Sequence, residues 1–195
     1  MSSPAADPAA AAEDRLLMER VRAGDEAAFA ALMERWERPV KSVVARMVLN
    51  AAEAEELAQE AFVRLWQRRN DFRPGAEFRP WLLAIAVNLA RNRLRWWRRR
   101  PSVELGAWLE SGGDAGEMSG GAGALERAER VAAVQAAVAA LPVEFREALV
   151  LFEFEQLSQG EIAAVLRTTP KAVESRVARA REKLRRVLQK DHRSR

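Results

Sequence analysis

Apolar side chains recur along this chain three or four residues apart, and runs of alternating apolar and polar residues are rare. Between residues 52 and 69, for example, Leu57, Ala61 and Leu65 fall on one face of a helix. Residues 170–189 repeat this spacing with a strongly basic opposite face. The pattern predicts an all-α fold.

Turn-forming residues divide the periodic segments into separate helices. Residues 23–25 break residues 14–49 into two helices, and Asp25 is the expected N-cap of the second one. Residues 70–75 contain asparagine, proline and glycine, which predicts a loop. A further helix is expected from residue 77 or 78 to residue 99, where a proline-containing segment ends the first module.

A glycine-rich acidic segment follows this first module. Residues 105–123 hold seven of the ten glycines in the chain, which predicts a flexible tether. Its one aromatic residue, Trp108, either docks on another surface or is buried against one of the modules. The predicted organisation is a disordered lead over residues 1–13, a helical module over 14–101, the tether over 102–124, a second helical module over 125–190 and a basic tail over 191–195.

The second module carries the signals of a helix-turn-helix. Ser158 and Glu161 form a capping box before a short helix, and Thr169 caps a basic amphipathic helix that starts at Pro170. A short helix, a tight turn and a basic helix together describe this motif. Arg167 stands where such turns often carry glycine, so we expect a less sharp turn here.

The net charge is only +4, but the charges are segregated along the chain. Residues 78–103 contain arginines and no acidic residue, residues 144–161 carry five glutamates and a single basic residue, and residues 167–195 are strongly basic. A basic run is often only a solvated helix face. Two basic blocks that each end a helical module, one of them within a helix-turn-helix pattern, favour binding to nucleic-acid phosphates.

The composition argues against an enzyme, a metal site and a membrane protein. The chain has no cysteine and one histidine, His192, which alone builds neither a metal site nor a catalytic triad. No carboxylate cluster for two metal ions and no glycine-rich phosphate loop is visible. The longest apolar run, residues 81–87, is far shorter than the ~20 residues of a membrane helix. We expect a cytoplasmic, non-enzymatic protein with no cofactor.

Four segments of the chain resemble one family of transcription proteins. Residues 54–66, which read AEELAQEAFVRLW, are similar to a polymerase-binding helix, and residues 78–88 are similar to a promoter-melting region. Residues 157–163 and 173–182 are similar to the helix-turn-helix of the same family. The family is the extracytoplasmic-function (ECF) group of bacterial sigma factors.

The resemblance implies that the first module reads the −10 promoter element and traps a base flipped out of the DNA. Phe72 would stack on this base, and Asn88 and Asn92 would bind its edges. Two alternatives stay open: Phe72 as part of the core, and Asn88 in a buried hydrogen bond between helix and loop. The implied −10 contacts are Phe72, Asn88, Arg91, Asn92, Arg95, Arg98 and Arg99.

The resemblance also implies protein partners. These are core RNA polymerase, through the clamp helices of its largest subunit and the flap of the second, and an anti-sigma factor. The tether would let the two modules reach separate promoter elements. The implied polymerase contacts are Glu56, Gln59, Glu60, Arg64 and Gln67.

For the −35 element, the resemblance implies that the last helix enters the major groove by its N-terminal residues. Glu174 stands where the family often carries lysine, so it either alters −35 specificity or lies just outside the groove. The competing hypothesis is a helix-turn-helix regulator that binds DNA without core polymerase. The implied −35 contacts are Lys171, Ala172, Glu174, Ser175, Arg176, Arg179 and Lys183.

Overall fold

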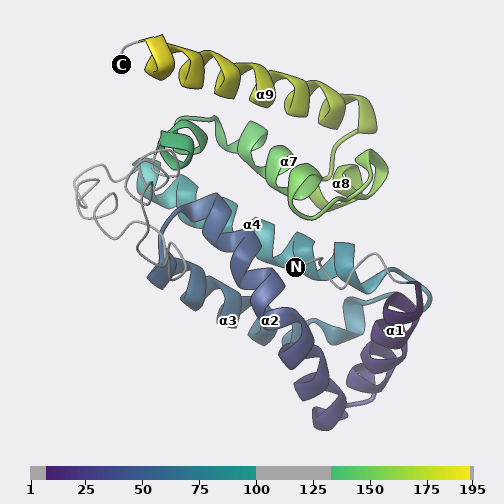
Figure 1. Ribbon diagram of the computed structural model, residues 1–195. Helices are drawn as coiled ribbons and strands as arrows, with labels where there is room; N and C mark the ends of the chain where they lie inside the picture. Colours follow the sequence, from purple (N-terminus) through teal and green to yellow (C-terminus); the bar gives the residue numbers. More distant parts are fainter. Residues whose placement is uncertain (1–7, 100–132, 194–195) are drawn as a thin grey trace, which may run out of the picture.

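The computed structural model describes residues 8–99 and 133–193, and within these ranges all regular structure is helical (Figure 1). This confirms the predicted all-α class. Residues 133–139 are helical as well. The other elements are α1 (Pro8–Arg22), α2 (Glu26–Val48), α3 (Ala51–Gln67), the 3-10 turn η2 (Arg69–Asp71), α4 (Phe78–Arg99), α7 (Val143–Glu153), α8 (Gln159–Leu166) and α9 (Pro170–Arg193).

Most helix boundaries follow the local signals in the sequence. Asp25 caps α2, and its carboxylate accepts a hydrogen bond from the Ala28 amide at 3.0 Å. The predicted lead over residues 1–13 is too long, because α1 already begins at Pro8. Proline suits the first helical turn, and the alanines that follow it are strong helix formers.

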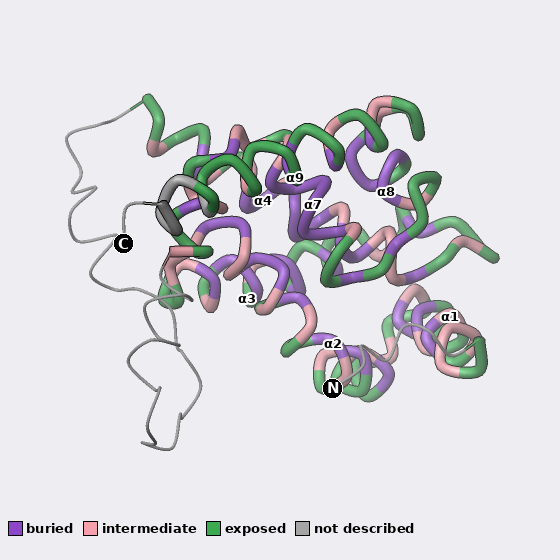
Figure 2. The backbone as a smooth tube through the Cα atoms, turned by 45° about the horizontal axis from the view of Figure 1, so that its top comes forward, coloured by how far each residue is buried: buried purple, intermediate pink, exposed green. Residues whose placement is uncertain are grey.

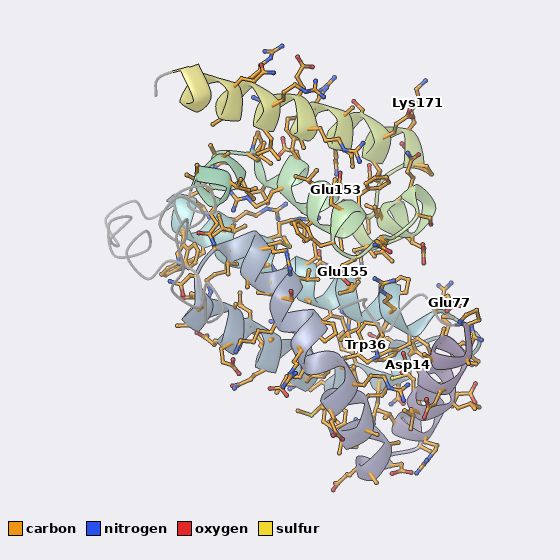
Figure 3. The ribbon with its side chains drawn as sticks, in the orientation of Figure 1. Asp14, Trp36, Glu77, Glu153, Glu155 and Lys171 are labelled. Carbon is orange, nitrogen blue, oxygen red and sulfur yellow. The ribbon has the colours of Figure 1, made fainter. Side chains whose placement is uncertain are left out.

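A buried carboxylate fixes α1 against α2 in the first module. Asp14 is buried and accepts a hydrogen bond from the Trp36 indole nitrogen at 3.0 Å. Its other oxygen accepts one from Arg35 at 2.7 Å. Burial raises the pKa of Asp14, and the two hydrogen bonds oppose that rise. Figure 3 shows Asp14 and Trp36 facing each other between the two helices.

The second module is built on the predicted caps. Ser158 and Glu161 form the reciprocal capping box of α8, and Thr169 caps α9 through a 3.2 Å bond from the Ala172 amide. The predicted basic tail is wrong in part, since α9 continues to Arg193. The tether, Trp108 and the start of the helix expected from residue 125 lie outside the described residues.

The two modules form one body in this structure. Helices α7 and α8 lie across α2 and α4, with α9 as the outermost layer (Figures 1 and 2). Buried apolar side chains from both modules belong to a single cluster. The Arg46 guanidinium of α2 also stacks on the Phe154 ring, with 4.4 Å to the ring centroid. The modules that the sequence predicts as separately placed are therefore packed together here.

Arg146 of α7 joins the modules through backbone carbonyls. Its buried guanidinium donates to the carbonyl of Met47 in α2 at 2.6 Å, and to the carbonyls of Ala139 and Leu141 in its own module. These carbonyls lie at or just beyond helix ends, where the helix supplies no internal donor. Burial lowers the pKa of Arg146 to about 10.

We expect Arg146→Met to lower the free energy of unfolding by about 2 kcal/mol, because buried carbonyls lose their donor while the side-chain volume is kept. Urea denaturation followed by circular dichroism measures this change. Arg38→Met, at an exposed position of α2, is the matched control and should leave the midpoint nearly unchanged. Equal midpoints for both variants would contradict the assigned role of Arg146.

Candidate nucleic-acid interface

The turn between α8 and α9 sets the direction of the last helix. Arg167 adopts the left-handed conformation, with φ of 52° and ψ of 54°. The amide of the next residue, Thr168, donates to the Ala163 carbonyl at 2.9 Å and ends α8. The expectation of a less sharp turn is wrong, because Arg167 takes the backbone conformation that glycine usually provides.

Helix α9 buries one face and exposes the other, as Figure 2 shows. Val173, Val177 and Ala180 are buried against the module, and the first turn carries no acidic residue. Ala172 and Arg176 are half-buried. The other predicted −35 contacts are exposed: Lys171, Glu174, Ser175, Arg179 and Lys183.

Helix α4 presents the predicted −10 contacts along its length. Asn88 and Arg91 are half-buried, and the Arg91 guanidinium donates to the Asn88 side-chain oxygen at 3.4 Å. The structure therefore gives Asn88 a partner on its own helix and not in the loop. The remaining predicted contacts on this helix are exposed: Asn92, Arg95, Arg98 and Arg99.

Phe72 lies in the core, which supports the packing alternative left open by the sequence. Its side chain is 1% exposed. Its ring meets Trp81 edge-on with centroids 5.2 Å apart, and Phe78 edge-on at 6.4 Å. A base cannot stack on a ring that is already enclosed by two aromatic neighbours, so the stacking role predicted for Phe72 does not fit this structure.

Acidic residues of the second module face the basic helices, and the sequence did not predict these contacts. Glu147 accepts a hydrogen bond from Nε of Arg91 in α4 at 2.9 Å, and Nη2 of Arg91 lies 2.8 Å from the same oxygen. The other carboxylate oxygen of Glu147 lies 3.7 Å from Arg176 of α9. Burial raises the pKa of Glu147, and the charge of Arg91 opposes that rise. Arg79 forms a second contact between modules, 3.1 Å from a carboxylate oxygen of Glu155. The available signal in the sequence was the group of glutamates between residues 144 and 161, for which no binding partner was predicted.

The predicted polymerase contacts all lie on α3. Four of these residues lie in the middle of the helix, and each has a side-chain partner. Glu56 forms an ion pair with Arg93, Gln59 donates a hydrogen bond to Glu55, and Glu60 forms an ion pair with Arg64. Gln67 is exposed near the end of the helix. These side chains form a solvent-facing surface. Two of them, Glu60 and Arg64, line an open cavity of about 460 Å³ between α3 and α4, which Asn92 of the predicted −10 contacts also lines.

An apolar groove beside this surface was also missed. It has a volume of about 340 Å³ and lies between α2 and α3. Phe29 and Trp66 meet at its wall with ring centroids 5.1 Å apart, and Val63 on its rim is 53% exposed. The spacing of Phe29 with Met33 and of Phe62 with Trp66, four residues apart on two helices, was the available signal.

No helix in the part of the chain that the structure describes is long and apolar enough to cross a membrane. No three acidic or histidine side chains among residues 8–99 and 133–193 come together as metal ligands would.

A helix-turn-helix with a basic, solvent-facing second helix defines a DNA-binding protein. Residues 32–100 match the family described as Sigma-70 region 2, and residues 132–184 match Sigma-70, region 4. The chain belongs to the sigma-70 family, in its ECF group. It is a sigma factor, the subunit that directs RNA polymerase to promoters.

Curated relatives agree along nearly the whole chain. The RNA polymerase sigma-H factor of Pseudomonas aeruginosa is 35% identical over 182 residues, which cover 91% of this chain and 94% of the relative. The ECF RNA polymerase sigma-E factor of Escherichia coli is 37% identical over 174 residues, which cover 87% and 91%.

Solved structures share the fold. CnrH, in complex with the cytosolic domain of CnrY, superposes with a TM-score of 0.69 at 30% identity, covering 92% of this chain and 99% of that one. The sigma factor RpoE of Bartonella quintana, in complex with the anti-sigma factor NepR, gives a TM-score of 0.62 at 21% identity, covering 83% and 96%. The second likeness concerns the fold alone.

We expect Arg167→Gly to raise the thermal midpoint by about 1–2 °C. Glycine relieves roughly 1 kcal/mol of left-handed strain, which exceeds the ~0.5 kcal/mol of added entropy in the unfolded chain. Arg185→Gly makes the same chemical change inside α9, where helix propensity falls by about 1 kcal/mol, and should lower the midpoint. Differential scanning calorimetry measures both, and shifts of the same sign would disagree with this account.

Proposed function

We propose that the chain binds core RNA polymerase through α3, reads the −35 element with α9 and the −10 element with α4, and helps to melt the −10 element. One observation carries this proposal: two exposed basic helix faces occur in a chain that contains both sigma regions. A chain with one such face would support DNA binding but would not explain recognition of two elements.

Recognition of the −35 element is assigned to the first turns of α9. The N-terminus of this helix is free of acidic side chains and carries a partial positive charge, which favours approach to the DNA backbone. Lys171 and Ser175 are exposed and can face base edges, while Arg179 and Lys183 can hold phosphates. Glu174 can accept a hydrogen bond from cytosine N4.

Recognition of the −10 element is assigned to α4. Unstacking a base costs a few kcal/mol, which contacts to the base and to the backbone must offset. The amides of Asn88 and Asn92 can bind the edges of an unpaired base, and the exposed arginines at positions 95, 98 and 99 can hold the single strand. With Phe72 in the core, base recognition rests on these polar groups.

Attachment to polymerase is assigned to α3 and to the groove beside it. We assign Glu56, Gln59, Glu60, Arg64 and Gln67 to the clamp helices of the largest subunit, and the second module to the flap of the second subunit. Gln59 and Gln67 also line the groove, so the polar surface and the apolar groove form one continuous area. An apolar side chain of the clamp helices is the occupant we propose for the groove, since polar rims around apolar pockets are typical of protein interfaces.

We also propose that an anti-sigma factor binds this chain. The similar structures of CnrH and of the Bartonella quintana sigma factor contain partners, and the second of these partners is an anti-sigma factor. We assign no catalytic activity to the chain itself. The cytoplasmic location expected from the sequence stays a prediction. A regulator that acts without polymerase is not favoured, because regions 2 and 4 occur together and in order.

Run-off transcription with purified core polymerase tests the proposal. On a duplex promoter selected from genomic fragments, we expect Asn88→Ala to lower the transcript yield about tenfold, because one base contact contributes about 1–3 kcal/mol. On a template already opened at −10, the loss should be smaller, since the cost of melting is removed.

Glu19→Ala, at an exposed position of α1, is the control and should transcribe like the unchanged chain. Absence of a transcript from every fragment with the unchanged chain would refute the proposed function. An equal loss on duplex and opened templates would refute the assigned role of Asn88 in melting.

A further inference from the structure

Glu147 lies between the two helices that the proposed function assigns to DNA. Its side chain is 3% exposed and contacts Arg91 of α4 and Arg176 of α9. We call these three residues the Glu147 cluster. The Glu147 carboxylate thus contacts a guanidinium of α4, assigned to the −10 element, and a guanidinium of α9, assigned to the −35 element, at the same time.

A carboxylate and a DNA phosphate compete for the same donors. Both present anionic oxygens to the planar guanidinium, with donor–acceptor distances of about 2.7–2.9 Å. The two contacts from Arg91 to Glu147 already have this length. While these contacts persist, Arg91 cannot bind a phosphate, and the 3.7 Å contact draws Arg176 toward Glu147 as well.

A second ion pair lies at the same module interface. Arg79 near the start of α4 reaches Glu155, just after α7, at its carboxylate and also at its backbone carbonyl. Both side chains are mostly buried, and Figure 3 shows Glu155 beside α4. The modules are therefore connected by ion pairs at two points along α4 and not by apolar packing alone.

We propose that Glu147 is an internal substitute for DNA phosphate, which holds α4 and α9 in a closed form until polymerase and promoter DNA separate the modules. This inference rests on the proposed function for the roles of Arg91 and Arg176. The Arg79–Glu155 pair holds the same closed form at a second point along α4.

The exchange is energetically feasible because a buried ion pair gains little over its separated, solvated partners. Desolvation of the two charges offsets most of their attraction. Burial raises the pKa of Glu147, which is the mark of that desolvation. Phosphate contacts can therefore replace the carboxylate contacts at little net cost once the modules separate.

Fluorescence energy transfer between the modules tests closure without DNA or polymerase. The chain has no cysteine, so Ala30→Cys in α2 and Ala164→Cys in α8, both exposed, accept one dye each. Glu147→Gln removes the charge and keeps the shape of the side chain. We expect it to raise the ratio of open to closed molecules about tenfold over the unchanged chain.

Glu153→Gln is the matched control. Glu153 lies on the same helix and pairs with Arg181 of α9 within the second module, so the same loss of charge leaves the module interface intact. We expect the energy transfer of this control to match that of the unchanged chain. We also expect Glu147→Gln, but not Glu153→Gln, to bind promoter DNA without polymerase about tenfold more tightly.

Arg79→Gln keeps the inference testable if Glu147→Gln fails to fold, because it weakens the closed form from the first module. Energy transfer that is equal in Glu147→Gln, Arg79→Gln and the control would overturn the inference. An open unchanged chain would overturn it as well. If Glu147→Gln opens the chain but the unchanged chain directs no transcription, closure by Glu147 is supported and only the proposed function is refuted.

Discussion

Two adjacent charged residues of α7, Arg146 and Glu147, are buried where the two modules meet. Arg146 donates to the Met47 carbonyl at the end of α2, and Glu147 accepts from Arg91 of α4. A buried charge without partners costs several kcal/mol. If the modules separate, water or another ligand therefore has to replace the partners that Arg146 and Glu147 lose. Together with the apolar cluster that both modules share, this pair fixes the placement of α7 on α2 and α4, and α8 and α9 pack on α7.

This constraint divides the side chains that the proposed function assigns to DNA into two groups. The arginines at the end of α4 and the basic residues along the outer face of α9 are exposed. Arg91 and Arg176 are instead held by Glu147 at the module interface. The proposed function assigns the two modules to separate promoter elements, and the structure joins these modules. Separation of the modules would release Arg91, whereas Arg176 lies in the same module as Glu147.

Local chemistry in the sequence predicted the helices and most of their ends. Asp25, Ser158 and Glu161 form their capping hydrogen bonds with residues three positions away, so the sequence alone predicts these caps. The burial of Arg146 and Glu147 was not visible, because charged residues on a helix normally face solvent and their partners are distant in sequence. Phe72 lies within the predicted loop of residues 70–75, so the sequence left both a stacking role and a core position open, and the structure encloses its ring between Phe78 and Trp81.

The central claim is that buried charges of α7 make the two modules one cooperative unit in the free chain. Calorimetric unfolding tests it most directly, because the ratio of calorimetric to van't Hoff enthalpy counts the cooperative units. The account predicts a single transition with a ratio near one for the whole chain at low salt. Two separate transitions, each assignable to one module, would contradict it.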